Sequence, residues 1–399
     1  METACGKPLE VCLQGLQRLE YRGYDSAGVA LTAPGMDHVE VRKKAGRLAN
    51  LIEDVERKPM PMATVGIGHT RWATNGVPND INAHPHTSQD GKVAIIHNGI
   101  IENASQLRLD LQTEGYRFSS ETDTEVAAKL LGKISEKIVE ETGKPDLFKA
   151  VRRLARMLEG AFTILATDCR QPGIVVGARH DSPLVVGLGE GENFLGSDVA
   201  AFVAYTKRAM EIDQDQAVMV SADKVVVSDF MGNIVADPKT YTVDWDASAA
   251  EKGGWDSFMN KEIHEGPAAV QRTLLGRLGK DGNLNLDEVR IDEHDFKAID
   301  KIIVIACGTA AYAGMVAKYA IEHWVRIPVE VELAHEFRYR DPILTPRTLV
   351  VAISQSGETM DTLMALRHAR EQGSKVLAIC NTQGASIPRE SDAVLYTHA

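Results

Sequence analysis

Apolar and polar positions in the first half of the chain alternate in short runs, with longer helical stretches between them. Residues 7–20 place their apolar side chains mostly on one helical face, which predicts a helix ending at the turn-rich segment 21–26. Two further helical stretches are expected at 123–140 and 147–158. Short β-rich runs recur at 28–32, 63–68, 93–97, 161–167, 173–179, 184–187, 217–221 and 224–228. Strands and helices grouped in this way predict an α+β domain over residues 1–225.

The second part of the chain follows a different pattern. Residues 226–292 are rich in Asp, Lys and Gly and contain one helical stretch at 261–275, so we interpret them as a connecting region. From residue 299, apolar runs alternate with helical stretches at 310–324 and 359–372. The runs predict strands at 301–306, 329–333, 348–354, 375–380 and 393–396.

Continuous apolar strands are typical of a parallel sheet whose two faces are both covered. We therefore predict a doubly wound α/β domain over residues 293–399. A domain rarely ends on a strand that nothing covers, and we expect the chain to be cut at its C-terminus.

Composition excludes several classes of partner. The formal net charge of −12 argues against non-specific binding to nucleic acid or anionic membranes, which requires a basic surface. No apolar run approaches the roughly 18 residues that a bilayer span requires. The five cysteines are scattered without a C-x-x-C pair, which predicts reduced thiols in the cytoplasm rather than disulfides or a zinc site. We expect neither a metal nor a cofactor.

Two strand-to-helix turns in the second domain carry small and hydroxylic residues, IACGTA at 305–310 and ISQSGET at 353–359. Ligands of open α/β sheets bind outside the carboxyl ends of the strands. Such turns offer phosphate their backbone N–H groups, hydroxyls and the positive end of a helix. Neither contains the Gly-Lys-Ser/Thr of a nucleotide P-loop, so a sugar phosphate is favoured over ATP. The alternative is that Ser354, Ser356 and Thr359 only cap a helix.

Four polar clusters in the first 130 residues fall at predicted strand ends or turns. A free amino acid requires a cation for its carboxylate and an anion for its ammonium, which Arg71 and Asp123 offer. Asn98 and the backbone N–H of Gly99 offer two donors to the oxyanion of an acyl transfer. Each cluster alone is equally consistent with a structural turn. The clusters are YRGYDSAG at 21–28, HTRWATNG at 69–76, HNG at 97–99 and ETDTE at 121–125.

Taken together, these motifs resemble a known family. The SQSGET turn resembles the signature of the phosphosugar isomerase (SIS) domain, and CGTA resembles the start of the first such domain in glucosamine-6-phosphate synthases. The four clusters, in order, are similar to the glutaminase domain of class II glutamine amidotransferases, the N-terminal nucleophile type. The resemblance continues through FMNKEIHE at 258–265 and covers nearly the whole chain.

The resemblance implies glutamine-dependent amination and isomerisation of fructose 6-phosphate to glucosamine 6-phosphate, the first step of amino-sugar synthesis, by a homodimer in full-length form. It assigns the oxyanion hole to Asn98 and Gly99. It assigns glutamine binding to Arg71 (carboxylate), Trp72 (which also gates an ammonia route), Thr74, Asn75, His84 and Asp123 (amine). It assigns sugar-phosphate binding to Thr309, Ala310, Ser354, Gln355, Ser356 and Thr359.

The chain departs from the family at several positions. Asn75 and Ala310 stand where many members have histidine and serine. The family's nucleophile is an N-terminal cysteine followed by Gly-Ile and a short strand, and counting back from residues 15–22 places it before Met1. Cys5 precedes Gly6 but is followed by Lys7-Pro8, and proline does not enter a central strand. We therefore expect no nucleophile and an inactive chain.

Two alternatives remain from other classes. A different class II amidotransferase would share the first domain but not the SIS turn. A non-enzymatic sugar-phosphate-binding remnant or regulator would accommodate the missing nucleophile, although no DNA-binding segment accompanies it.

Overall fold

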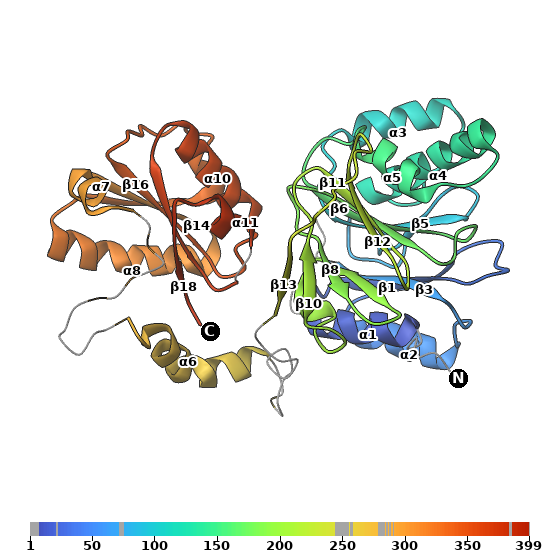
Figure 1. Cartoon of the computed structure of the whole chain (residues 1–399), viewed down its shortest axis with the longest axis horizontal. Coiled ribbons are helices and arrows are strands. Elements are labelled where there is room, and N and C mark those ends of the chain that lie inside the picture. Colours follow the sequence, from blue (N-terminus) through green and yellow to red (C-terminus); the bar gives the residue numbers. More distant parts are fainter. Residues whose placement is uncertain are drawn as a thin grey trace. The chain divides into compact units, whose positions relative to one another are not determined.

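The computed structural model describes residues 8–20, 23–71, 76–243, 255, 258–277, 284, 286, 289, 291–382 and 385–398. The chain divides into two compact units, Met1–Glu251 and Lys252–Ala399 (Figure 1). This division differs from the predicted boundaries at 225 and 292. Strand β12 (Val225–Asp229) pairs with β11 (Gln216–Val220), and β13 (Thr240–Thr242) pairs with β10 (Arg208–Glu211). Residues 226–243 therefore belong to the first unit, and 226–292 is not one connecting segment.

The described residues of the first unit form three sheets. A three-stranded sheet has the order β2-β1-β3, a six-stranded sheet β12-β11-β7-β6-β5-β4, and a four-stranded sheet β13-β10-β8-β9. The other strands are β1 (Ser26–Thr32), β2 (Glu40–Ala45), β3 (Val65–Arg71), β4 (His86–Thr87), β5 (Val93–Gly99), β6 (Phe162–Asp168), β7 (Val175–His180), β8 (Val185–Leu188) and β9 (Asn193–Gly196). The helices are α1 (Pro8–Leu19), α2 (Leu48–Arg57), α3 (Ala104–Thr113), α4 (Asp123–Thr142), α5 (Leu147–Ala155) and the short η2 (Val199–Ala201).

Helical layers enclose two layers of sheet in this unit. Figure 1 shows α3, α4 and α5 on the outer side of the sheet that contains β5 and β6, and α1 and α2 beside β1 and β3. Between the two sheets, Ala30 and Ile67 pack against Ala94 and Ile96. Every residue of β1 is buried, because one face of this strand meets the helices and the other meets the second sheet.

The second unit is a five-stranded parallel sheet of order β15-β14-β16-β17-β18. Its strands are β14 (Lys301–Ala306), β15 (Val329–Leu333), β16 (Thr348–Ser354), β17 (Lys375–Cys380) and β18 (Ala393–Tyr396). Its helices are α6 (Phe258–Leu274), α7 (Glu293–Ala298), α8 (Gly308–Val325), α9 (Ala334–Phe337), α10 (Met360–Glu371) and α11 (Ser386–Glu390).

Alternate residues of these strands face opposite layers, as the strand period requires. Ile303 and Val350 pack with Leu363 of α10 on one face, and Ile302 and Leu349 pack with Ile321 of α8 on the other. Both faces of β14 and β16 are covered, so the middle of each of these strands is apolar. The edge strand β15 instead alternates apolar residues with Glu330 and Glu332. The predicted α+β and doubly wound α/β architectures are confirmed. Within the described residues, no helix combines the length and apolar character needed to cross a membrane.

Candidate functional site

In the first unit, a strand end and a helix start bring two opposite charges together. β3 ends at Arg71 and α4 begins at Asp123, and both side chains are buried, at 4% and 7% exposure. Burial lowers the pKa of Arg71 below its usual value, while the negative charges of Asp123 and Asp25 oppose that change.

Asp123 is held in place by several donors. One carboxylate oxygen accepts the Ile101 backbone N–H at 3.0 Å, and the other lies 3.9 Å from His97 Nδ1 and 3.4 Å from the Thr124 hydroxyl. The N-terminal end of α4 also favours negative charge at this position. A carboxylate has about four acceptor positions, so a ligand ammonium can still bind Asp123.

Asn98 and Gly99 lie at the end of β5. The Asn98 side chain is exposed, whereas its neighbour His97 is buried. Gly99 has φ of +127°, and a Cβ atom there would lie 2.1 Å from the Ala161 carbonyl oxygen. Only glycine fits this backbone. The geometry places an exposed side-chain amide beside a glycine that the close approach of the Ala161 carbonyl requires.

Four imidazoles lie beside this strand end: His84, His86 and His97 are buried, and His69 is half-buried. The His84 ring centroid lies 4.5 Å from that of His69, 5.3 Å from His86 and 6.5 Å from His97. Burial lowers the pKa of His69 to about 3 and, together with neighbouring charges, holds the pKa of His84 and His86 well below the usual value. These rings are therefore neutral at pH 7. Within the described residues, His84 Nδ1 has no hydrogen-bond partner.

Lys43 fixes the segment that carries His84. Its ammonium donates hydrogen bonds to the carbonyl oxygens of Ile81 (3.1 Å), Ala83 (2.7 Å) and Pro85 (3.2 Å). Burial lowers the pKa of Lys43 to about 8. No local sequence pattern predicts this role, because β2 and residues 81–85 meet only in the folded chain.

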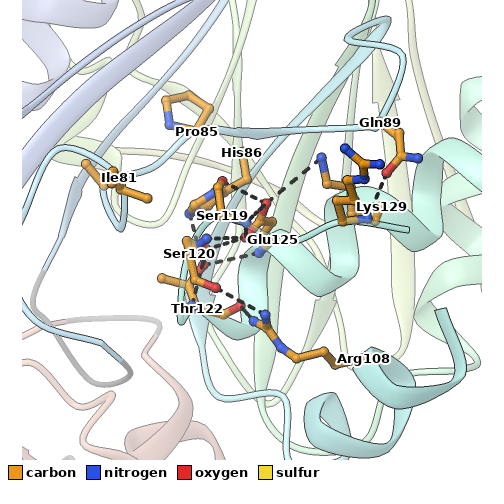
Figure 2. A network of polar contacts seen from close by, with 12 residues as sticks. Ile81, Pro85, His86, Gln89, Arg108, Ser119, Ser120, Thr122, Glu125 and Lys129 are labelled. Carbon is orange, nitrogen blue, oxygen red and sulfur yellow. Dashed lines mark hydrogen bonds and ion pairs between the residues drawn. The ribbon is translucent and has the colours of Figure 1, made fainter. Parts of the chain in front are cut away.

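A second polar network orders the loop before Asp123 (Figure 2). The Glu125 carboxylate accepts backbone N–H bonds from Ser119 and Ser120, at 3.0 and 2.6 Å, and both serine hydroxyls donate to it as well. Burial alone would raise the pKa of Glu125, but these hydrogen bonds outweigh it and keep the pKa below its usual value. Thr122 caps α4 through the Glu125 N–H and contacts His86 Nε2 at 3.0 Å. This network holds the first turn of α4, and hence Asp123, in place.

A cavity of about 360 Å³ adjoins the end of β5. It is lined by consecutive residues of two edge strands, 66–70 of β3 and 193–196 of β9, and by Cys12, His97 and Asn98. β3 bonds only to β1, and β9 only to β8, among the described strands. Two open strand edges thus border one cavity beside the expected oxyanion pair.

Several predicted residues lie outside the described part of the chain. They are Tyr21 and Arg22, the glutamine contacts Trp72, Thr74 and Asn75, and the cysteine at position 5.

In the second unit, the two predicted turns flank a change in strand order. β14 lies between β15 and β16, so the chain leaves β14 towards one side and then returns to the other. Ligands of doubly wound sheets bind at such a switch point. Cys307 follows β14 and the 354–359 turn follows β16, which places both turns at this point.

The 354–359 turn is organised by its own hydrogen bonds. The Ser354 hydroxyl accepts the Gly357 N–H at 3.1 Å and lies 3.0 Å from the Thr359 hydroxyl, and Ser354 is only 3% exposed. The Ser356 hydroxyl accepts the Glu358 N–H at 3.3 Å. Thr359 is the N-cap of α10 but makes no side-chain capping bond. Gln355 is exposed, and Ser356 and Thr359 are half-buried.

The first turn has a simpler arrangement. Gly308, Thr309 and Ala310 begin α8; Gly308 and Thr309 are exposed and Ala310 is half-buried. Their backbone N–H groups belong to the first turn of an 18-residue helix, where an anion is favoured. Ala310 supplies no hydroxyl, so Thr309 is the hydroxylic residue of this turn.

Comparison with known proteins identifies both units. A family of glutamine amidotransferase domains matches residues 54–236, and the SIS domain family matches residues 296–399. An isomerizing glutamine–fructose-6-phosphate aminotransferase of Corynebacterium diphtheriae is 63% identical over 391 residues, which are 98% of this chain and 61% of that protein. The Streptomyces coelicolor protein of the same name is 61% identical over 391 residues, with 98% and 62% covered.

The protein of that name from Mycobacterium tuberculosis is 55% identical over 395 residues, which are 98% of this chain and 62% of that protein. The chain thus spans about three fifths of the length of the curated relatives it matches. With its amidotransferase domain and its SIS domain, the chain belongs to the glutamine–fructose-6-phosphate aminotransferase family.

Proposed function

We propose that this chain provides the glutamine-binding and sugar-phosphate-binding parts of an enzyme that makes glucosamine 6-phosphate from fructose 6-phosphate and glutamine, releasing glutamate. One observation carries the proposal: Arg71 and Asp123, of opposite charge and both buried, lie close enough to interact. Asp123 also lies next to His97 and Ile101, which flank Asn98 and Gly99 in the chain. This arrangement matches the carboxylate, the ammonium and the reacting amide of glutamine.

Each group has a distinct task in this proposal. Arg71 binds the glutamine α-carboxylate in a charge-assisted pair, and Asp123 accepts hydrogen bonds from the ammonium. Asn98 and the Gly99 N–H stabilise the oxyanion that forms when a thiolate attacks the side-chain amide. His84, whose Nδ1 has no hydrogen-bond partner among the described residues, supplies a further contact to the substrate. The released ammonia then aminates C2 of the sugar phosphate.

The nucleophile must enter from a segment that reaches this cavity. Cys12 lines the cavity, but burial raises the pKa of its thiol to about 12, so the thiolate is scarcely populated at pH 7. Two open strand edges along the cavity suit an extended segment. We propose that a cysteine on such a segment attacks glutamine, as the family resemblance implies.

The sugar phosphate is proposed to bind at the switch point of the second unit. Backbone N–H groups that open α8, with Gln355, Ser356, Thr309 and Thr359, are the donors to phosphate. Ser354 is buried and supports the turn. The clustering of these donors favours the synthase over another class II amidotransferase, and the paired charges in the first unit favour it over a sugar-phosphate sensor.

The glutamine site can be tested directly by calorimetric titration of the chain with glutamine. Asp123→Asn keeps an oxygen for the Ile101 N–H but loses the charge, and should weaken binding by about 10- to 100-fold. Asp110→Asn, an exposed change on α3, is the matched control. Equal affinity of wild type and Asp123→Asn would overturn the assignment.

Glutamate release tests the position of the nucleophile. If glutamine is hydrolysed, the rate should be unchanged in Cys12→Ala and Cys5→Ala variants. Loss of activity in either variant would show that this cysteine is the nucleophile.

The sugar-phosphate site requires a separate titration with fructose 6-phosphate. Thr359→Ala removes one charge-assisted hydrogen bond to phosphate and should weaken binding by about 10- to 100-fold. Thr345→Ala, an exposed change near the amino end of β16, should have no effect. Unchanged affinity in both variants would place the phosphate elsewhere.

We also propose a cytoplasmic location, which the free thiols of Cys12, Cys169, Cys307 and Cys380 support, because disulfides form in oxidising compartments. The homodimer that the resemblance implies stays a prediction.

A further inference from the structure

Three side chains of different chemical types converge at the carboxyl ends of β14, β15 and β16. They are the Cys307 thiol, the His335 imidazole and the Asp361 carboxylate, and one ligand atom of each lies within 4.8 Å of the others. Cys307 follows β14, His335 lies in α9 just after β15, and Asp361 is in the first turn of α10. Three separate elements therefore direct potential ligands to one point.

The chemistry of this set suits a borderline divalent cation. Sulfur and imidazole nitrogen are preferred by zinc over magnesium or calcium, and a carboxylate commonly completes such sites. Tetrahedral zinc places its ligand atoms about 3.3–3.7 Å apart. His335 and Asp361 are exposed and can reach this spacing by side-chain rotation, while Cys307 is half-buried and fixed at the strand end.

None of the three ligands is committed to another strong interaction in the described structure. Cys307 is the N-cap of α8, but its side chain makes no capping bond, and its sulfur accepts only a long contact of 3.9 Å from the Thr362 hydroxyl. The bound metal and its ligands would together carry no net charge, so they would place no positive charge at the positive N-terminal ends of these helices. A thiolate, a carboxylate and a neutral imidazole together balance the two charges of the cation.

We propose that Cys307, His335 and Asp361 form a binding site for Zn²⁺ or a similar thiophilic divalent cation. Three protein ligands leave a fourth position for water or for another ligand, as in zinc sites that remain open. The site lies at the same strand ends as the 354–359 turn. This inference does not depend on the proposed reaction, because it concerns metal binding by the second unit alone.

A second group of possible ligands provides a useful contrast. Asp292, His294 and Asp295 also approach one another, but all three lie at the start of the six-residue helix α7. Asp292 is already occupied in capping, since its carboxylate accepts the Asp295 N–H at 2.7 Å. This group has no sulfur and is a cluster of surface charges, so it serves as the control.

The whole chain should be titrated with Co²⁺, which replaces Zn²⁺ and gives an intense near-ultraviolet band when bound to a thiolate. We expect this band in the wild type, its disappearance on addition of Zn²⁺, and its loss in Cys307→Ser. His335→Ala and Asp361→Asn, both exposed, should weaken Zn²⁺ binding in calorimetry by at least about tenfold, since losing even an outer partner of a ligand costs that much. His294→Ala should bind like the wild type.

Several outcomes would overturn the proposal: no sulfur-to-cobalt band in the wild type, a band that persists in Cys307→Ser, or unchanged affinity in both His335→Ala and Asp361→Asn. An equal loss in His294→Ala would assign the ion to α7 instead. Circular dichroism of each variant checks folding, and His335→Ala and Asp361→Asn keep the test decisive if Cys307→Ser does not fold.

Discussion

The two candidate sites differ in how they bind charge. In the first unit, Arg71, Asp123 and three histidines are buried side chains that come from different parts of the chain. In the second unit, most of the candidate donors to phosphate are backbone N–H groups and hydroxyls of two short turns, and few titratable groups are involved. A zwitterion requires both signs of charge at fixed positions, whereas phosphate can be bound by main-chain dipoles.

This difference has a cost in stability. Buried ionisable groups lose hydration, so the first site depends on hydrogen bonds such as those around Glu125 and on neighbours that keep histidines neutral. The second site carries almost no such penalty. We therefore expect mutations and pH to affect the first unit more strongly than the second.

The largest expected effect is the difference in stability loss when a glycine of each site is replaced by alanine. At Gly99 an added Cβ would lie 2.1 Å from a backbone oxygen, so Gly99→Ala should destabilise the chain by about 3 kcal/mol or more. At Gly357, φ is +68° and the nearest atom is the Ala385 side chain at 2.6 Å, so Gly357→Ala should cost less, about 1–2 kcal/mol. Urea unfolding measures both.

Gly115→Ala is the control for backbone strain alone, because φ is +90° and no atom of the described residues lies within 4 Å of the added Cβ. It should cost about 1 kcal/mol. Equal losses in Gly99→Ala and Gly115→Ala would mean that the sheet relaxes around Gly99.

The next largest effect is the loss of folding stability at acidic pH. The folded state holds the pKa of His69 at about 3, below its unfolded value near 6.5, so the unfolded chain binds more protons between these values. Stability is therefore complete above pH 6.5 and falls as the pH decreases, by about 1.4 kcal/mol per pH unit for each such histidine. Unfolding at pH 7.5 and 5.5 measures the slope, which His69→Gln should reduce. The same slope in wild type and variant would contradict this view.

The smallest expected effect is the difference in stability loss between two Ser→Ala variants. Ser119→Ala removes a 3.0 Å hydrogen bond to the buried Glu125 carboxylate and should cost about 1–2 kcal/mol. Ser356→Ala removes a 3.3 Å bond in a half-buried turn and should cost about 0.5 kcal/mol. Thermal unfolding of the two variants measures the difference. A larger loss for Ser356→Ala would reverse the comparison.

The second unit was the easier one to predict from sequence. Its five strands were expected at the positions where they occur, because strands covered on both faces are continuous apolar runs, with β15 (VEVEL) as the exception. In the first unit, β2 was missed: its sequence EVRKKA is charged, and every residue is only half-buried. Helix α2 was also missed, although Leu48, Leu51, Ile52 and Val55 have helical spacing.

The same contrast holds for the sites. Each phosphate turn is one contiguous motif and is visible as such. Arg71 and Asp123 stood out as charges within polar clusters, but the approach of His69, His86 and His97 to His84 depends on how β3, β4 and β5 pack. Lys43 donates hydrogen bonds to carbonyl groups that lie far along the chain, and no local sequence pattern predicts these contacts.

The open edge of β3 should be visible in hydrogen–deuterium exchange. In an antiparallel pair, alternate residues direct their N–H groups towards the partner or away from it. Every second amide of β3 that points away from β1 faces the cavity, so deuterium uptake along residues 66–70 should alternate between slow and fast. The amides of the fully buried β1 should all exchange slowly. An extended segment that fills the cavity would remove the alternation, so this strand reports whether the cavity is occupied.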